Sequence, residues 1–395
     1  MVPSSPREPG HRSVPPFAWW FRRPVVIGSV AIAAVGACAD FENLTVPGIA
    51  TESQAICNLA HPPPTGGVAV TNGGFEEFVV ACRHIDLGDG SNGGVPGYET
   101  FGYDLDNTCT TADAGSSCIE PSWASASHVD SPGGRDNAFG ANAYRINNVL
   151  EAGSVSSVAN SGINQGYLTL AIRVRGYNGL TADGSVIVDY YGVVLHAGPD
   201  GGIPTPQWDG SDVYDVLTNY VSAPDAGGSY DLDRPIYEDM QAYVTTNPND
   251  AQTGVLVSKI DALLVATPFH LSHVVMTAEI VTTGKIRTLA NVVIAGRIRV
   301  DEYLAALSAV SVNGTNMPFC QDSPGYSDEK ASACAYADIN YSGRNDGTQP
   351  CDAISMAWRY ADSAKISLLA VIPPTPADVS TCAPGLSPAD DHCGP

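Results

Sequence analysis

The chain has 395 residues, a formal net charge of −23 and only 15% charged residues, with 40 glycines and 29 prolines. No basic stripe is available to neutralise phosphates, so the composition excludes a nucleic-acid partner. The scarcity of charged residues and the abundance of turn formers favour short strands over helix bundles. The length allows one large domain or two medium ones.

The N-terminal residues have the pattern of an export signal. Arg22 and Arg23 precede a short apolar run from Pro24 to Ala34, followed by small residues. A positive segment before such a run is typical of a secretory signal peptide, and the run is too short for a membrane span. We therefore predict a signal peptide over residues 1–37.

The next residues, Val35-Gly36-Ala37-Cys38, consist of an aliphatic residue, two small residues and a cysteine. They resemble the lipobox of bacterial lipoproteins, and the resemblance covers these four residues alone. It implies that Cys38 becomes the lipidated first residue of an exported protein, anchored to the outer membrane or cell surface. The alternative is ordinary signal cleavage, with Cys38 joining a disulfide.

Export also predicts disulfides among the remaining cysteines. Proximity in sequence suggests the pairs Cys57–Cys82, Cys109–Cys118 and Cys382–Cys393. Spacing alone does not determine pairing. Because nine cysteines follow Cys38, one of Cys320, Cys334 and Cys351 must stay free or pair elsewhere.

Residues 38–67 lack a sustained hydrophobic period and are predicted to be a flexible tether. Beyond them, alternating apolar residues predict strands over 74–82, 168–175, 185–195, 254–267, 270–285 and 288–300. Asn178-Gly179 and Asp183-Gly184 are turn signals between the second and third of these strands. We predict a mainly β protein, an antiparallel β-sandwich of jelly-roll type over residues 68–300.

The hydrophobic period changes after residue 300. Asp301 can cap a helix over 302–310, and Asp352 can cap another over 353–365. Phe139 to Leu150 is a short helix or an irregular arm. We predict a small helical segment over 301–372, stapled by disulfides, and a Pro-rich tail over 373–395.

Residues 101–137 form a long polar loop within the predicted sandwich. Asp104, Asp106 and Thr108 alternate as ligands do around a hard cation, and Asp130, Asp136 and Asn137 can close the other side. Oxygen ligands in an exported protein favour calcium. The alternative is a turn region in which aspartates bond nearby backbone amides.

A second candidate site is basic. Arg173 and Arg175 share one strand face, as do Arg297 and Arg299. If the two strands adjoin, these arginines form a ligand-binding patch, with Trp208 at its rim to stack on a sugar ring. The alternative is a solvated sheet face whose arginines pair with surplus acids.

No catalytic set is found. A Gly-x-Ser-x-Gly nucleophile elbow is absent, as is the Glu-x-Asp-x-x-Glu strand of laminarinase-type glycosidases. Whether the protein is an enzyme stays open. The leading hypothesis is a non-enzymatic surface module that binds glycan or another extracellular ligand, such as a surface protein, with a structural calcium. The alternatives are a glycan-degrading hydrolase with an atypical carboxylate pair and a purely structural surface protein.

Overall fold

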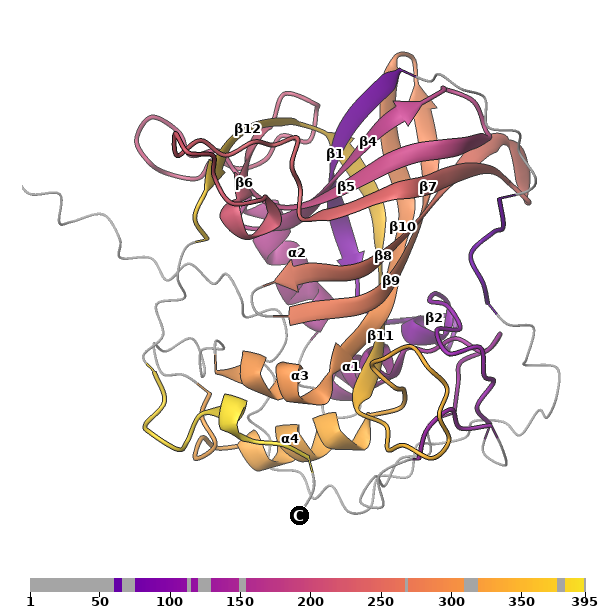
Figure 1. Cartoon of the computed structure of the whole chain (residues 1–395), viewed down its shortest axis with the longest axis vertical. Helices are drawn as coiled ribbons and strands as arrows, with labels where there is room; N and C mark the ends of the chain where they lie inside the picture. The colour runs from indigo at the N-terminus through magenta and orange to yellow at the C-terminus, as the bar shows by residue number, and fades with distance from the viewer. Residues whose placement is uncertain are drawn as a thin grey trace, which may run out of the picture.

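The computed structural model describes residues 60–65, 75–111, 115–119, 129–148, 154–266, 269–308, 319–374 and 381–393. Eight antiparallel strands close into a barrel, so the protein is mainly β as predicted but the predicted sandwich is wrong (Figure 1). The barrel strands are β1 (Glu76–Asp86), β4 (Thr169–Tyr177), β5 (Asp183–Leu195), β7 (Tyr237–Asn247), β8 (Asp250–Ala266), β9 (Phe269–Thr283), β10 (Ile286–Arg299) and β11 (Ala353–Lys365).

Each barrel strand pairs with its neighbours in sequence order, and β11 returns to pair with β1. A jelly roll would require strands to cross between two sheets, whereas this meander keeps all eight in one closed wall. β5 takes part in two pairings. Its first part pairs with β7, and its last residues pair with β6 (Val213–Leu217), which lies outside the barrel beside β12 (Ser367–Ile372).

The barrel interior is packed with side chains, because alternate residues of each strand point inward. The inward face follows from the register, in which Val80 lies opposite Ile172 and Ile172 opposite Tyr190. Seven inward residues, each less than 2% exposed, are Val80, Ile172, Tyr190, Leu256, Met276, Ile294 and Trp358.

β11 corrects a sequence prediction. The helix expected over 353–365 is wrong, because this segment is a strand between β1 and β10. Ile354, Met356, Trp358 and Tyr360 alternate along it, which is the period of a strand. The predicted boundary at residue 300 therefore does not separate barrel from helices, since β11 lies beyond it.

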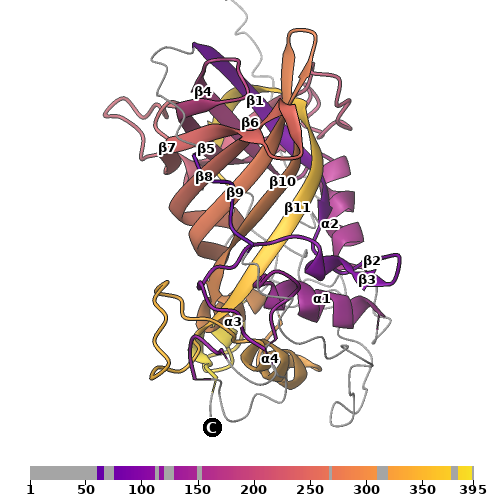
Figure 2. The same cartoon turned by 90° about the vertical axis from the view of Figure 1, so that its right-hand side faces the viewer.

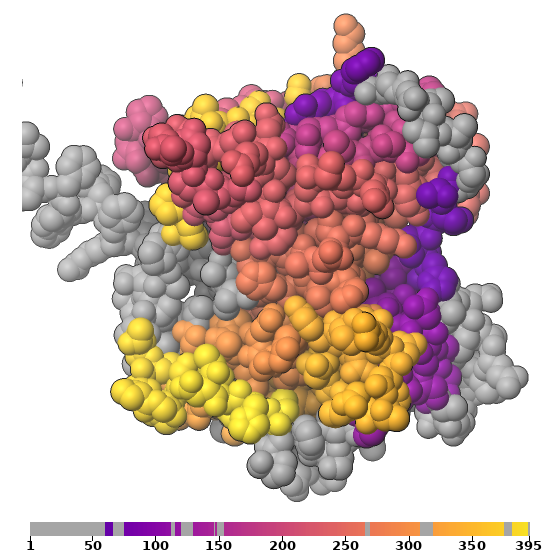
Figure 3. Space-filling view, in the orientation of Figure 1, coloured from indigo at the N-terminus to yellow at the C-terminus, as the bar shows by residue number. Residues whose placement is uncertain are grey.

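Four α-helices flank the barrel in the described residues: α1 (Ala138–Asn148), α2 (Val155–Asn164), α3 (Val300–Leu307) and α4 (Tyr326–Ala335). α1 and α3 lie close to where helices were predicted. The remaining short elements are β2 (Ser91–Asn92), β3 (Val95–Pro96), η2 (Gly97–Glu99), η3 (Thr218–Tyr220) and η5 (Pro388–Asp390). Figure 3 shows many of the C-terminal residues, orange to yellow, at the lower end of the molecule, whereas β12 lies toward the upper end (Figure 1). None of the helices described is both long and apolar enough to cross a membrane.

Three disulfides lie wholly within the described residues, and each connects segments that are distant in sequence: Cys118–Cys351, Cys320–Cys382 and Cys334–Cys393. The predicted pairs Cys109–Cys118 and Cys382–Cys393 are therefore wrong, although all four of these cysteines are disulfide-bonded.

The predicted pair Cys57–Cys82 is also wrong, because Cys82 is a free thiol, fully buried on β1. The unpaired cysteine was expected among Cys320, Cys334 and Cys351, yet all three are bonded. Cys57, the signal peptide and Cys38 lie outside the described residues, as does most of the predicted tether.

Gly192 marks the point where β5 leaves β7 and joins β6. A Cβ added there would lie 2.3 Å from a ring atom of Tyr220, whose side chain is buried and whose hydroxyl donates to the Leu264 carbonyl at 2.7 Å. We expect Gly192→Ala to lower the free energy of unfolding by about 1–3 kcal/mol, because the ring has to shift within a packed core. Urea unfolding followed by tryptophan fluorescence measures this.

Gly162 provides the matched control, because it lies in α2 and no heavy atom lies within 4 Å of an added Cβ. Gly162→Ala should leave stability unchanged or raise it by up to about 1 kcal/mol, as alanine favours helix. Equal effects of the two substitutions would contradict the close packing of Tyr220 on β5.

Candidate metal centre

The first residues of the polar loop predicted over 101–137 lie on the outside of the barrel, across β9, β10 and β11 (Figure 2). Phe101 and Tyr103 pack on Ala295 and Ala357, whose small side chains leave room for the two rings. The Tyr103 hydroxyl is 2.5 Å from that of Thr277. These contacts fix the backbone that immediately precedes the acidic residues.

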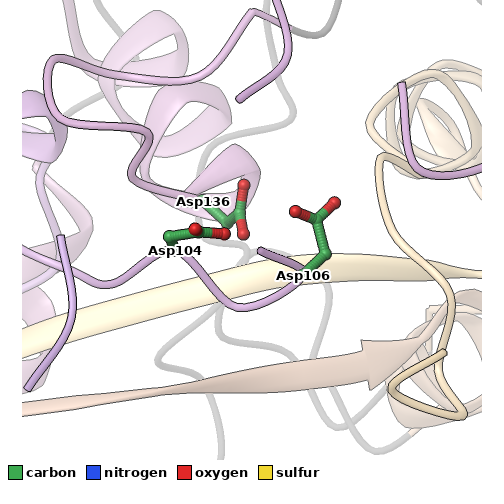
Figure 4. Close-up of side chains that lie close together, drawn as sticks. All are labelled: Asp104, Asp106 and Asp136. Atoms are coloured by element: carbon green, nitrogen blue, oxygen red, sulfur yellow. The ribbon is translucent and has the colours of Figure 1, made fainter. Parts of the chain in front are cut away.

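Asp104, Asp106 and Asp136 come together at this position. One carboxylate oxygen of each lies within 4.8 Å of the other two, and all three residues are buried. Figure 4 shows the three carboxylates turned toward a common space. This acidic triad could hold a metal ion.

Asp104 differs from the other two members of the acidic triad in its lack of hydrogen bonds. Its side chain is 0% exposed, and neither carboxylate oxygen has a hydrogen-bond partner. The amides of Asn107 and Thr108 approach closely enough to lower its pKa but do not reach hydrogen-bonding geometry. Burial and the charge of Asp106 outweigh them, so the pKa of Asp104 is raised. An ionised carboxylate in this state is costly unless a cation joins it.

The other two members each accept one backbone hydrogen bond. Asp106 Oδ1 accepts from the Thr108 amide at 2.8 Å, and Asp136 Oδ2 accepts from the Leu105 amide at 2.6 Å. These bonds orient the carboxylates and leave lone pairs on each for a cation.

Two further aspartates surround the acidic triad. Asp130 Oδ2 accepts from the Thr110 amide at 2.7 Å and shares a hydrogen bond with Asp136. Asp338 accepts from both the amide and the hydroxyl of Ser355 on β11. Burial raises the pKa of Asp130 to about 8 and that of Asp338 to about 7, with Asp106 adding to both. Burial and the same neighbouring charges raise the pKa of Asp136 well above its ordinary value.

Arg297 lies among these acids on the outer face of β10 and is 2% exposed. Its Nη2 donates to the Leu105 carbonyl, whereas Nε and Nη1 have no partner. Burial lowers the pKa of Arg297, while Asp106, Asp136, Asp338 and Asp104 oppose that shift. The guanidinium therefore offsets part of the negative charge without occupying the oxygens of Asp104.

The remaining predicted ligands have other contacts. Thr108 Oγ1 accepts from the Asn345 side chain at 2.8 Å. Asn137 Oδ1 accepts from the amides of Gly140 in α1 and Ala357 in β11, at 3.1 and 2.9 Å. These bonds give Asn137 a capping role that ties α1 to the barrel. The prediction did not include Asp338 or Arg297 in the site.

The four arginines of the predicted basic patch are not brought together. Arg173 and Arg175 lie on β4, Arg297 and Arg299 lie on β10, and β1 and β11 separate the two strands. Arg173 and Arg175 both bond Asp189, at 2.6 and 2.8 Å, and Arg299 bonds Asp301 at 2.8 Å.

Trp208 lies apart from these arginines and has a strained backbone, with φ of +59°. Its amide donates to Asp212 at 2.6 Å, and the Arg83 guanidinium lies 5.4 Å from the centre of its ring. Asp362 Oδ1 lies 3.0 Å from Arg83 Nε and 2.8 Å from His84 Nδ1. We call these four side chains, Trp208, Arg83, His84 and Asp362, the Trp208 patch.

No family model, curated protein or solved structure matches the chain. Its function therefore has to be inferred from the sites themselves.

The raised carboxyl pKa values predict how stability depends on pH. The folded protein holds protons on Asp130 and Asp338 that the unfolded chain, with pKa near 3.8, releases. The free energy of unfolding in a chelator should therefore fall as pH rises from about 4 to 8, by at least about 1 kcal/mol between pH 5 and 8. Urea titrations at several pH values measure the change.

Asp130→Asn is the matched variant, because its side-chain oxygen can still accept from Thr110 while it no longer titrates. The decline with pH should be shallower in this variant. A free energy of unfolding that rises between pH 5 and 8, with no difference between wild type and variant, would contradict the raised pKa values.

Proposed function

We propose that the protein is an exported, lipid-anchored surface module that binds an extracellular ligand without catalysis and uses calcium to secure its acidic loop. Export is supported by the signal-like residues before Cys38 and by three disulfides within the described residues. The acidic loop is the one predicted over residues 101–137, and its described residues around the acidic triad lie on the barrel wall.

The proposed calcium site depends on one observation. The Asp104 carboxylate is buried beside Asp106 and Asp136 without a hydrogen-bond partner. Calcium takes oxygen ligands from carboxylates and backbone carbonyls, and extracellular modules commonly use it. A bound divalent cation would offset the repulsion among the acids and replace the protons that they otherwise hold.

The burial of the acidic triad also favours an ion over the alternative of a glycan hydrolase. A retaining or inverting glycosidase needs two carboxyl groups that flank a sugar in an accessible site. Asp104, Asp106 and Asp136 are instead each 6% exposed or less, beneath their own loop. An ion can enter such a site where a polysaccharide chain has no room.

The ligand surface that the geometry favours is the Trp208 patch. An aromatic ring beside an arginine, a histidine and a carboxylate offers stacking together with hydrogen-bond donors and acceptors, the combination that suits a sugar. His84 and Asp362 are 49% and 43% exposed. Backbone strain at Trp208 and at His84, with φ of +55°, is the kind that concentrates at functional positions.

Calcium should stabilise the folded protein. At a concentration of 100 times Kd, the expected gain is about 2.7 kcal/mol, measured as a rise in Tm relative to protein in chelator. Asp104→Asn should abolish the calcium response, because it removes the charge of the unpartnered side chain.

Asp261→Asn, which changes an exposed aspartate of β8, should retain the full response. A wild-type Tm that is the same with calcium and with chelator would remove calcium from the proposal.

Ligand binding is tested on a glycan array with the barrel protein and its Trp208→Ala variant. The variant should lose at least about tenfold in affinity, equivalent to about 1.4 kcal/mol, because stacking on the ring is lost. Tyr230→Ala, which removes an exposed ring outside the Trp208 patch, should bind as the wild type does. Retention on no glycan would overturn the carbohydrate ligand while leaving the calcium result unaffected.

A further inference from the structure

Residues 60–65 lie directly beside the acidic triad. The Ala60 amide donates to the Gly133 carbonyl at 2.6 Å, and the Ala60 carbonyl accepts from the Asp104 amide at 3.0 Å. Further along, the Tyr243 hydroxyl of β7 donates to the Pro63 carbonyl at 2.6 Å. This N-terminal segment therefore touches the triad at one end and the barrel wall at the other, and Figure 3 shows indigo and purple residues running down that side.

His61 brings an imidazole to the edge of the acidic triad. Its Nε2 lies 4.0 Å from Asp104 Oδ2, and its side chain is 46% exposed. Both oxygens of Asp104 lack a hydrogen-bond partner in the described residues, although the Asn107 and Thr108 amides lie near them. Two ligand atoms that share a zinc ion lie about 3–3.5 Å apart, given metal–ligand bonds near 2.1 Å. A movement of about 1 Å by this partly exposed side chain would therefore bring it into the site.

We propose that His61 is a fourth ligand that the site adds when it binds a nitrogen-preferring cation such as Zn²⁺. Such an ion, unlike Ca²⁺, then also fastens the N-terminal segment to the barrel. Imidazole suits zinc and related metals, whereas calcium takes oxygen ligands and gains little from it. The inference rests on the cation site of the proposed function but not on calcium being its ion.

Binding of His61 to the ion would also change how the N-terminal segment is held. With His61 bound to the ion, the segment is held by a metal–ligand bond in addition to its backbone hydrogen bonds. Tension from any anchor on the N-terminal side would then act directly on the acidic triad, and release of the ion would leave the segment held by its hydrogen bonds alone.

The test measures Zn²⁺ and Ca²⁺ binding to the full chain by calorimetry, in wild type and in His61→Ala. Loss of the imidazole should weaken Zn²⁺ binding by about 10–100-fold, the range typical when a group that supports a metal site is removed. The Ca²⁺ affinity should stay within about threefold of the wild-type value. Hydrogen exchange of residues 60–65 gives a second readout, with protection raised by Zn²⁺ in wild type but not in His61→Ala.

Two further variants distinguish failure of the cation site from failure of the role of His61. His270→Ala removes another exposed imidazole, on β9, and should change neither affinity. Asp104→Asn should weaken both ions. If wild type binds neither ion, the proposed cation site itself fails. If wild type binds Zn²⁺ and His61→Ala binds it equally well, only the role of His61 is overturned.

Discussion

Pairing of β1 with β11 is the constraint on which the rest of the structure depends, because it joins the beginning of the described barrel to a strand near the end of the chain. Six residue pairs connect the two strands, from Val80 opposite Lys365 to Asp86 opposite Arg359. The same β11 carries Ser355 and Ala357, which bond Asp338, Asn137 and the start of α1. The strand that closes the barrel therefore also holds the residues that flank the acidic triad.

The loop that carries the acidic triad has little apolar surface of its own, so its position has to come from other interactions. Phe101 and Tyr103 anchor its start on the barrel, and Cys118–Cys351 ties its middle to the segment that leads into β11. Cross-links of this kind are favoured in oxidising compartments. A cation at the triad would be a third anchor, placed where repulsion among buried carboxylates would otherwise open the loop.

Much of the fold follows from the sequence where the signal is local. The alternation in β4 and β5 and the pairing of Asp104 with Asp106 could be predicted because neighbours along the chain carry them, and the prediction extends to Asp136 because it lies in the same predicted loop. The sequence predicts a helix over β11 because Asp352 resembles an N-cap and the spacing of Ile354, Met356, Trp358, Ala361 and Ile366 is compatible with a helix as well as a strand. Asp338, Arg297 and the disulfide partners could not be predicted, because barrel closure brings them together; Cys118 and Cys351 are separated by 233 positions.

The difference between two buried arginines explains why the acidic triad could hold a cation, whereas the acids around Arg173 form an ordinary ion-pair network. Arg173 satisfies its partners directly, with bonds to Asp189 and Asp233 at 2.6 Å. A carboxylate engaged in this way has few lone pairs left for a metal. Arg297 is close enough to the acids to offset their charge, yet it forms no hydrogen bond with Asp104, Asp106 or Asp136 among the contacts described. It lowers the cost of gathering the acids while leaving their oxygens available to an ion.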